Sequence, residues 1–435
     1  MLEHQELDYL GRQQAINCMI DFVFHNHEII RPGEEAWLAR AKACQWGDLH
    51  LSEESTAWLD FQALIRRLLS DLVNGISALS GPTDVVHYFT GNYKWWRVFL
   101  SSRDSNLLRQ RGLLRSEERY LDLPALLELL KRSEEILMDV PEDIPLEKRV
   151  IEVNKDLSGA KLSNLLKHCK GMDSYFSLYI HGSRAIGDYT HFSDIDDLLI
   201  VHSNAWQNLR TLKQVAEVTS KLARVFQDID PLQHHGHWVY SDFDLLCFDE
   251  SIMPLIVLDT ARILCGRYRL EVFIRPNPGG FRRILWSIIQ EVRRDCLTAQ
   301  SDGINLYFLK NLISGISLLP ALTFQVLGQM IDKKSAILRS REIYSEQACE
   351  AIHWASHIRE NWAQIPTYGY LPVIRIVAKI LAPKKRHMAE IVARQLLPAI
   401  PPTRINGFEK VFPCILRLTD ESAERLREVV LHETS

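Results

Sequence analysis

The sequence of 435 residues has no two cysteines in a Cys-x-x-Cys spacing, although it contains eight cysteines. A structural zinc ribbon is therefore not expected, because such sites are built from closely spaced cysteine pairs. Single cysteines in apolar stretches usually pack as small hydrophobic side chains, and their dispersal favours a reducing compartment. We expect a cytoplasmic protein without a disulfide framework.

Long apolar runs are also scarce. The first residues, from Met1 to Gln14, are too polar for a secretory signal. Only Leu312–Met330 approaches the length that crosses a membrane, and serine, proline, threonine and glutamine interrupt it. We interpret this stretch as a buried pair of helices and expect no transmembrane segment and no membrane partner.

Repeats and low-complexity tracts are absent from the sequence, which argues against a solenoid or a fibrous protein. With 46% hydrophobic and 24% charged residues, the composition is that of a soluble globular protein and not of a disordered one. The length corresponds to about two to four folding units.

The charge is unevenly distributed along the chain. Residues 271–435 contain 22 lysines and arginines against 16 acidic residues, whereas residues 1–270 contain 29 against 39. A basic C-terminal part beside an acidic remainder suits a phosphate-bearing ligand between them, although solvated helix faces give the same counts. The net charge of −4 argues against a processive enzyme on long nucleic acid and leaves a tRNA end as a possible partner.

Helical periodicity dominates both ends of the chain. Apolar residues recur there at spacings of three and four, the pattern of an amphipathic helix. These stretches are Tyr9–Phe24, Ala36–Cys44, Ala57–Leu79, Ile284–Val292, Leu306–Ile313, Ile343–Trp362, Val373–Ile380 and Ala389–Leu397, with breaks at Pro320, Pro366, Pro383 and Pro398–Pro402. We expect a helical N-terminal domain at residues 1–150 and a helical C-terminal domain at residues 271–435.

The segment between them, residues 151–270, has the pattern of a small α/β unit. A helix that ends near Cys169 is followed by strands at 175–180 and 195–201, with a turn from Gly182 to Asp188 between them. Helices are expected at 205–226 and 252–264, and a third strand at either 236–240 or 243–248. The fold class is therefore α+β, a small mixed sheet flanked by two helical domains.

The turn after the first of these strands suits phosphate binding. Gly182 lacks a Cβ atom, so the main chain can close on a phosphate, and Ser183 offers a hydroxyl and an N–H group to its oxygens. Arg184 lies in the same turn, where it either contacts phosphate or faces solvent. Gly182, Ser183 and Arg184 are candidate nucleotide-binding residues.

Two carboxylates follow at the start of the next strand. Residues i and i+2 of a strand project to the same face, so Asp194 and Asp196 should lie side by side while Ile195 points into the core. Asp197 then points to the opposite face, solvated or paired. A carboxylate pair suits Mg²⁺ or Mn²⁺, because these ions bind oxygen ligands and share their shell with water and phosphates.

This combination resembles the DNA polymerase β-like nucleotidyltransferase superfamily. The signature of that superfamily is an apolar residue, Gly-Ser or Gly-Gly, a spacer, and Asp-x-Asp or Asp-x-Glu before an apolar strand; Ile180–Ser183 and Asp194–Asp196 match it. The resemblance covers residues 174–266 and implies a minimal or antibiotic-type nucleotidyltransferase core. It implies that Asp194 and Asp196 bind the metal and that a nucleoside triphosphate such as ATP is the substrate.

The resemblance also implies a third carboxylate, a catalytic group and metal ligand on a later strand. Asp244 is our first choice if 243–248 is that strand, and Asp242 lies nearby.

The competing interpretation makes 236–240 the third strand. Ser241 then caps a helix, with Asp244 three residues later as in a capping box, and His235 or His237 takes the third position. A histidine there would depart from the superfamily pattern and weaken metal-dependent chemistry.

A lysine from the C-terminal helical domain completes the predicted site. Members of the superfamily place such a lysine on the triphosphate and an aromatic residue near the base. Lys310 and Tyr307 share a face of the predicted helix by their three-residue spacing, so Lys310 is the candidate for phosphate binding.

These patterns predict a nucleotidyltransferase that moves a nucleoside monophosphate from a nucleoside triphosphate to an acceptor hydroxyl and releases pyrophosphate. A helical domain after the core resembles kanamycin-type antibiotic nucleotidyltransferases, which favours a small-molecule or protein acceptor over an RNA end. A nucleotide second-messenger synthase and a catalytically degraded nucleotide-binding regulator are the alternatives. The acceptor, the base and the oligomeric state do not follow from the sequence.

Overall fold

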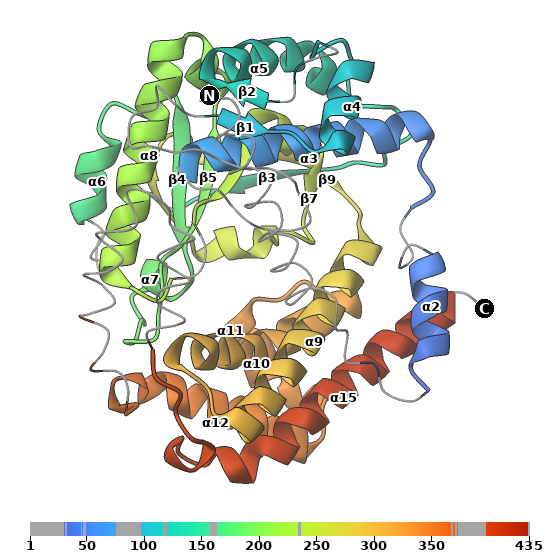
Figure 1. The fold of residues 1–435 in the computed structure, drawn as a ribbon, viewed down its shortest axis with the longest axis vertical. Helices are drawn as coiled ribbons and strands as arrows, with labels where there is room; N and C mark the ends of the chain where they lie inside the picture. Colours follow the sequence, from blue (N-terminus) through green and yellow to red (C-terminus); the bar gives the residue numbers. More distant parts are fainter. Residues whose placement is uncertain are drawn as a thin grey trace, which may run out of the picture.

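The computed structural model describes residues 30, 33–44, 46, 49–74, 97–115, 118, 120–156, 163–233, 236–366, 369, 372 and 397–433. Its fold is α+β, as the sequence predicts: sheets and their covering helices make up one half, and a bundle of helices the other (Figure 1). The predicted helices Tyr9–Phe24 and Val373–Ile380, and most of Ala389–Leu397, lie outside the described residues.

A four-stranded mixed sheet forms the centre of the first half. Its strand order is β6-β5-β4-β8, with β4 antiparallel to both β5 and β8 and β5 parallel to β6. The strands are β4 (Phe176–His181), β5 (Asp196–Val201), β6 (Trp238–Ser241) and β8 (Arg262–Cys265). All six residues of β4 are buried, as expected of a strand covered on both faces.

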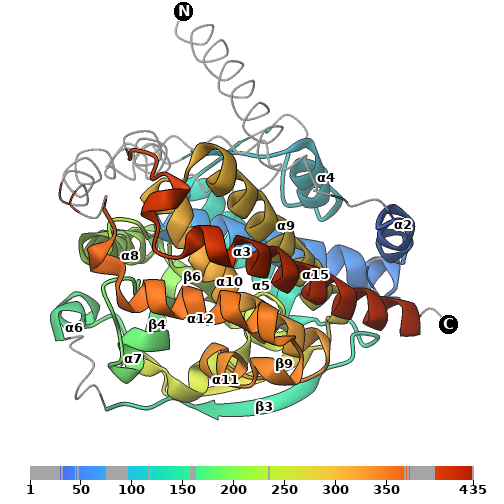
Figure 2. The ribbon, with the colours of Figure 1, turned by 90° about the horizontal axis from the view of Figure 1, so that it is seen from below.

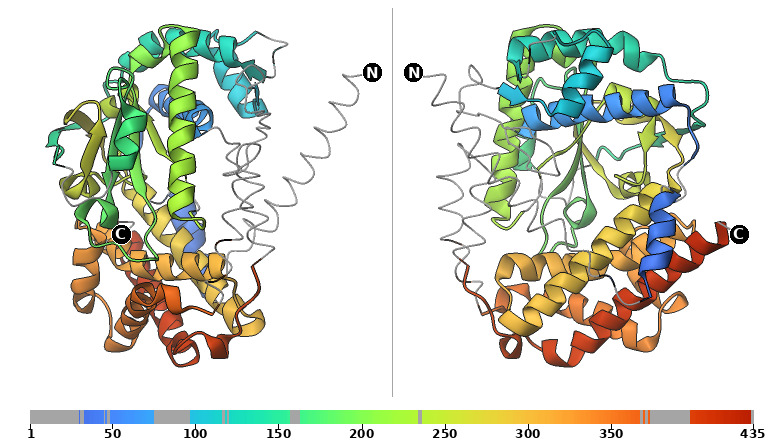
Figure 3. Two further views of the ribbon diagram at one scale, coloured as in Figure 1. Left: turned by 90° about the vertical axis from the view of Figure 1, so that its left-hand side faces the viewer. Right: turned by 45° about the vertical axis from the view of Figure 1, so that its right-hand side comes forward.

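Helices cover one face of this sheet. Alternate residues of the strands, such as Leu178 and Leu199, share a core with Leu68, Leu126 and Phe226 from these helices. In the left view of Figure 3 the long helix α8 runs along the sheet. The helices of this half are α3 (Glu53–Asn74), α4 (Ser102–Gln110), α5 (Leu123–Met138), α6 (Ser163–Cys169), α7 (Gly182–Ile186) and α8 (Leu209–Ile229).

A second, three-stranded sheet packs on the other face. Tyr179, Leu198 and Ile200 point to this side and form a core with Val272 and Ile274. Its order is β3-β9-β7, with β3 antiparallel and β7 parallel to β9. The remaining strands and short 3₁₀ helices of this half are β1 (Arg97–Phe99), β2 (Tyr120–Asp122), β3 (Glu147–Glu152), η3 (Ser203–Trp206), η4 (Asp242–Leu246), β7 (Phe248–Asp249), η5 (Leu255–Thr260) and β9 (Arg269–Arg275).

The other half is a helical bundle that follows β9 directly. Asn277 caps its first helix by accepting a hydrogen bond from the Gly280 N–H group at 2.8 Å, with Pro278 in the first turn. Seen from below, α9, α10, α12 and α15 cross the molecule (Figure 2). The elements are α9 (Pro278–Asp302), α10 (Leu306–Val326), α11 (Lys333–Leu338), η6 (Ser340–Glu342), α12 (Glu346–Glu360), η7 (Trp362–Gln364), η9 (Pro402–Arg404) and α15 (Phe408–Glu433).

The hydrophobic cores do not follow the predicted boundaries at residues 150 and 270. Helices α3 to α5 share one core with the sheet and α8. The helix α2 (Glu35–Ala43) belongs instead to the bundle, where Trp37 contacts Trp286 edge to face at 5.5 Å. The strand β3 crosses residue 150 and pairs with β9, which crosses residue 270. The sheets thus join segments that the predicted boundaries separate.

Three predicted elements are wrong. The stretch 252–264 is not a helix but the 3₁₀ helix η5 followed by β8. The stretch 243–248 is not the third strand, because η4 occupies most of it. The predicted break at Pro320 is wrong as well, since α10 runs through it as one helix. Proline removes one backbone hydrogen bond there, and burial of the surrounding apolar side chains keeps the helix intact.

Among the described residues, α10 is long and apolar enough to span a membrane, yet 78% of its most apolar window is buried within the protein. Gly315 lets this helix approach α9, because a Cβ atom there would lie 2.6 Å from Val292 Cγ2. Helix α10 therefore has the surroundings of a core helix.

A buried histidine near the C-terminal ends of β5 and β6 makes stability depend on pH. The Nε2 atom of His202 lies 2.8 Å from Ser177 Oγ. Burial lowers the pKa of His202 from its ordinary value of 6.5, and Arg267 adds to this while Asp242 opposes it. The unfolded chain therefore binds this proton more readily than the folded chain, so stability is lost as the pH falls below about 6.5.

We expect the free energy of unfolding to fall between pH 7 and pH 5, and to fall less in a His202→Gln variant. Urea unfolding at several pH values measures both slopes. Equal slopes in the two proteins would contradict this role of His202.

Candidate active site

The predicted glycine turn lies where β4 ends, and it forms a short helix. Gly182 begins α7 with φ = 69°, a conformation that favours glycine. A Cβ atom on Gly182 would lie 2.9 Å from Asp196 Oδ2, so the carboxylate rests directly against the glycine. Ser183 is half-buried in α7, and its carbonyl oxygen accepts the N–H group of Gly187, which ends the helix with φ = 87°.

The two motif carboxylates are brought to the same place. Asp194 and Asp196 are half-buried, whereas Ile195 between them is 1% exposed, which is the predicted alternation. Both charges act on the same three cations, Lys310, Lys333 and Arg359. Asp196 is the first residue of β5 and pairs with His181, the last residue of β4, and this pairing places it beside Gly182.

Asp244 does not join this pair, so the first-choice prediction for the third carboxylate is wrong. Its Oδ2 atom accepts the N–H group of Ser241 at 2.7 Å, and the two residues form a capping box at the start of η4. In the parallel register Ser241 pairs with Val201. The capping box therefore lies five residues along from Asp196, about 16 Å away at the opposite end of the sheet.

The environment of Asp244 is that of a structural residue. It is 1% exposed, and burial raises its pKa, while Arg66 and Ser241 oppose the increase. Asp242 also follows β6 and forms an ion pair with Arg267 at 2.8 Å. The alternative parse, with the strand ending at Ser241, is the one that the structure shows.

His237, one of the two histidines of that alternative, does not replace the third carboxylate either. His237 contacts Asp197 on the helix-covered face of the sheet, with 2.6 Å between Nδ1 and Oδ2. Asp197 is therefore paired and fully buried. His235 lies outside the described residues.

Lys310 reaches the carboxylates from the helical bundle. Its ammonium group contacts Asp230 and lies 3.9 Å from Asp194 Oδ2. Burial alone would lower the pKa of Lys310, but Asp230 and Asp194 outweigh burial and the net pKa is raised. The candidate lysine is thus charged and sits between two aspartates.

Asp230 is a site residue that the sequence analysis missed. It follows the last residue of α8, and its Oδ1 atom accepts the N–H group of Leu232 at 3.0 Å. The signal for it is the sequence Asp228-Ile229-Asp230-Pro231, a pair of carboxylates at the end of a long helix. In the fold, Asp230 rather than Asp244 is the third carboxylate close to Lys310.

Arg184 lies against the same site. It donates from Nη2 to the carbonyl oxygen of Ser193 at 2.9 Å, and its guanidinium group stacks over Tyr189 at 4.2 Å from the ring centre. Burial lowers its pKa, and Tyr189, Asp230 and Asp194 oppose this. Arg184 therefore supports the loop before Asp194 and adds positive charge beside it.

Two further cations from the bundle were not predicted. Water reaches the side chain of Lys333, yet the surrounding protein desolvates its ammonium group enough to lower the pKa; Arg359 adds to this, and Asp196 and Asp194 oppose it. Burial likewise lowers the pKa of Arg359, and Asp194, Asp196 and Asp188 oppose it. Lys333 lies in a basic pair, Lys333-Lys334, which is also a common pattern on solvated surfaces.

Phe192 connects the carboxylate loop with these cations. The Lys310 ammonium lies 5.3 Å and the Arg359 guanidinium 5.0 Å from the centre of its ring. Phe192 also packs edge to face on Trp362 at 5.0 Å and is part of the core of the bundle. This aromatic contact holds the loop from the sheet against the helices that bring the cations.

Asp194 and Asp196 fit a divalent cation only when a bound phosphate ligand completes the coordination of the ion. Among the described residues, no group of three or more His, Cys, Asp and Glu side chains is placed to hold a metal ion by itself. Mg²⁺ commonly takes one or two carboxylates and completes its shell with water and substrate phosphates. Asp194 and Asp196 supply the carboxylates, and Gly182 leaves the space that the Asp196 carboxylate occupies.

Gly182→Ala tests the contact between Gly182 and the Asp196 carboxylate, provided that the cost of alanine at a positive φ is measured separately. Alanine at φ = 69° costs about 1–2 kcal/mol of stability, and its Cβ atom would also displace the Asp196 carboxylate. Gly112→Ala is the matched control, because Gly112 has φ = 66° and a Cβ atom there would meet no other atom within 4 Å.

We expect similar losses in thermal stability for both variants and at least about a tenfold loss of metal-dependent nucleotide binding for Gly182→Ala alone. Calorimetry of unfolding and of nucleotide binding measures the two effects. Unchanged binding in Gly182→Ala would mean that Asp196 does not need its place beside the glycine.

No protein-family model matches this chain, and comparison with curated proteins and with solved structures finds no match. The geometry of these residues and the resemblance of the Gly-Ser and Asp-x-Asp motif are therefore what indicates a function for this chain.

Proposed function

We propose that the protein binds a nucleoside triphosphate with a divalent metal ion and transfers the nucleoside monophosphate to an acceptor hydroxyl. The observation that carries the proposal is the contact of Asp196 with Gly182, beside Asp194 and within reach of the charges of Lys310, Lys333 and Arg359. Paired carboxylates with a ring of cations suit a metal ion and a polyphosphate in one site. The resemblance to polymerase β-like nucleotidyltransferases supports the same function.

Asp194 and Asp196 would hold the metal ion, Mg²⁺ or Mn²⁺. When bound, the ion supplies positive charge to the phosphate oxygens and lowers the barrier to attack by a hydroxyl.

The residues of the chain itself bind and orient the triphosphate. Lys333, Arg359 and Arg184 neutralise phosphate charge, and Lys310 does so from between Asp194 and Asp230. In the transfer, the acceptor oxygen bonds to the α-phosphorus while the bridging α–β P–O bond breaks, and pyrophosphate leaves. The acceptor proton passes to a carboxylate or to solvent. Catalysis rests on positioning and charge neutralisation.

A second candidate is nucleotide binding without transfer. Strand β6 carries no acidic residue, and the nearby carboxylate of Asp230 is paired with Lys310. In that case the ammonium group of Lys310 takes the place of one metal ion. The site then binds a nucleotide but does not activate an acceptor.

Labelled triphosphates distinguish these functions. The purified chain is incubated with each of the four α-³²P-labelled ribonucleoside triphosphates and Mg²⁺, with and without cell extract. The proposed transferase attaches label to an acceptor in the extract, and a second-messenger synthase forms labelled oligonucleotides without extract. Retention of unreacted nucleotide, with no labelled product under any condition, favours the binding protein and contradicts the transferase.

A further inference from the structure

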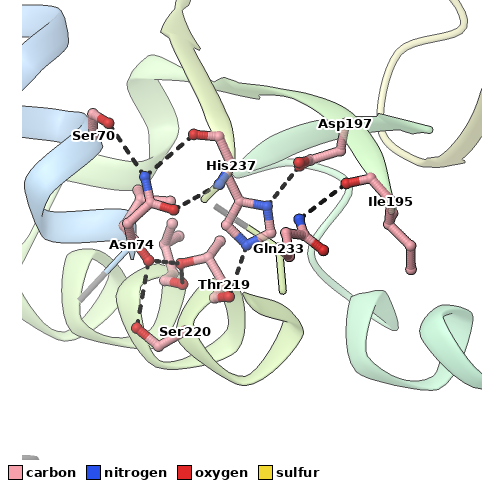
Figure 4. A network of polar contacts seen from close by, with 10 residues as sticks. Ser70, Asn74, Ile195, Asp197, Thr219, Ser220, Gln233 and His237 are labelled. Atoms are coloured by element: carbon pink, nitrogen blue, oxygen red, sulfur yellow. Dashed lines mark hydrogen bonds and ion pairs between the residues drawn. The ribbon is translucent and has the colours of Figure 1, made fainter. Parts of the chain in front are cut away.

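Behind the carboxylate site lies a buried polar network that the proposed chemistry does not use. Asp197 and His237 have side chains with 0% exposure, and Asp197 Oδ2 lies 2.6 Å from His237 Nδ1. The other ring nitrogen, Nε2, lies 2.9 Å from the carbonyl oxygen of Thr219 in α8. Figure 4 shows the imidazole between the strand and the helix.

The partners of the imidazole fix its hydrogen bonds. A carbonyl oxygen only accepts, so Nε2 donates its proton to Thr219, and Nδ1 is the ring atom that contacts Asp197. The other oxygen of Asp197, Oδ1, has no hydrogen-bond partner among the described residues. Among the residues that the structure describes, His237 is therefore the one hydrogen-bond partner of this carboxylate.

The main chain of His237 is held as firmly as its ring. Asn74, the last residue of α3, accepts the His237 N–H group with Oδ1 at 2.7 Å and donates from Nδ2 to the His237 carbonyl oxygen at 3.2 Å. Thr219 in turn donates its hydroxyl to the carbonyl oxygen of Val73 at 2.9 Å. Two helices thus fix the histidine that contacts Asp197 (Figure 4).

Asp196 lies between two such anchors. It is the first residue of β5, at the end of the ladder with β4, where main-chain pairing stops. On its C-terminal side, the next residue is anchored by His237. On its N-terminal side, the carbonyl oxygen of Ile195 accepts a hydrogen bond from Gln233 Nε2 at 3.0 Å. Side-chain hydrogen bonds to the residues on both sides of Asp196 therefore hold the main chain in place where strand pairing ends.

We propose that His237 is a positioning residue for Asp196: through Asp197 it fixes the start of β5 so that the Asp196 carboxylate stays beside Gly182. The consequence for metal and nucleotide binding rests on the proposed function. The position of the carboxylate beside the glycine does not, because it is a property of the protein without ligand.

Two substitutions separate the contacts of the ring. The amide nitrogen of asparagine falls near the place of Nδ1, so His237→Asn can keep the bond to Asp197. The amide nitrogen of glutamine falls near the place of Nε2, so His237→Gln can keep the bond to Thr219 and loses the bond to Asp197. Thr219→Val is the control, because it removes the buried hydroxyl and leaves the carbonyl oxygen that accepts from Nε2.

The first readout needs no ligand. With ¹⁵N-glycine labelling, the amide resonance of Gly182 reports the carboxylate beside it, and Asp196→Asn gives the shift that follows from loss of its charge. We expect His237→Gln to move this resonance by at least half as much as Asp196→Asn does, and His237→Asn and Thr219→Val to leave it nearly in place. A Gly182 resonance that stays in place in His237→Gln, or that moves equally in all three variants, overturns the proposal.

The second readout is the concentration of Mn²⁺ that half-saturates ATP binding. It is compared between the wild-type protein and the three variants at temperatures equally far below the melting temperature of each protein. We expect it to rise at least fivefold in His237→Gln and less than twofold in the other two variants. If the Gly182 resonance responds as expected and the wild-type protein does not bind Mn²⁺ with ATP, the positioning role is supported and the proposed function fails.

Discussion

Replacing both Asp194 and Asp196 by asparagine is expected to reduce nucleotidyl transfer by at least about 10³-fold and to remove the effect of Mg²⁺ on nucleotide binding. Both carboxylates act on the same cations, and Asp196 lies against Gly182, so they form one unit. Asparagine keeps the size of the side chain and removes its charge.

The fold should survive this double change, because Lys310 keeps its contact with Asp230. The matched control is Glu135→Gln with Asp139→Asn, two exposed carboxylates at the end of α5. The assay is transfer of label from an α-³²P-labelled triphosphate, and the control should keep full activity. Transfer in the double variant within tenfold of the wild type would show that the chemistry lies elsewhere.

Lys310→Met is expected to lower the free energy of unfolding by about 3–5 kcal/mol, since it leaves the buried carboxylate of Asp230 without its partner. The side chain of Lys310 is 1% exposed, and its ammonium group contacts Asp230 and lies 3.9 Å from Asp194 Oδ2. Adding Asp230→Asn to this variant should restore part of the loss, because the unpaired buried charge is then removed. Denaturant unfolding of the two single variants and the double variant gives the coupling energy directly.

The pH dependence gives an independent check on Lys310. Its folded pKa is raised above the ordinary value of 10.5, chiefly by Asp230 and Asp194 against the effect of burial. The pair therefore stabilises the fold below about pH 10.5, and this contribution is lost as the pH rises through the folded pKa. A loss of less than about 1 kcal/mol in Lys310→Met, with the same alkaline stability profile as the wild type, would contradict the pairing.

The local part of the site follows from the sequence because its geometry is set by neighbours along the chain. The alternation of Asp194, Ile195 and Asp196 extends the two-residue period of β5 into the residues just before it, and Gly182 follows directly on the preceding strand, β4. Whether these residues bind a metal ion or a nucleotide is not decided by the fold and stays a proposal.

The long-range part of the site could not be predicted in the same way. Arg359 and Lys333 meet the carboxylates only because the bundle packs on the loop that carries Phe192. Asp230 was missed because an Asp-x-Asp pair at the end of a helix does not by itself indicate a site. Asp244 was misplaced because an acidic residue three positions after a serine fits both a strand and a capping box, and the capping box was formed.

The remaining errors concern strands whose sequences do not show a clear strand pattern. Strand β8 has only four residues, and the apolar stretch before it shows helical spacing. The pairing of β8 with β4 could therefore not be predicted from the residues around it. Strands β3 and β9 pair across more than a hundred residues, and the exposed, charged residues of β3 resemble a linker.

The most direct measurement of the central claim is the affinity of the wild-type protein for a non-hydrolysable ATP analogue, with and without Mg²⁺, by isothermal titration calorimetry. Carboxylates that share a metal ion with the triphosphate predict binding at least tenfold tighter with Mg²⁺, and no such gain in the Asp194→Asn, Asp196→Asn double variant. Equal affinity with and without Mg²⁺ in the wild type, or the same gain in the double variant, would contradict the account.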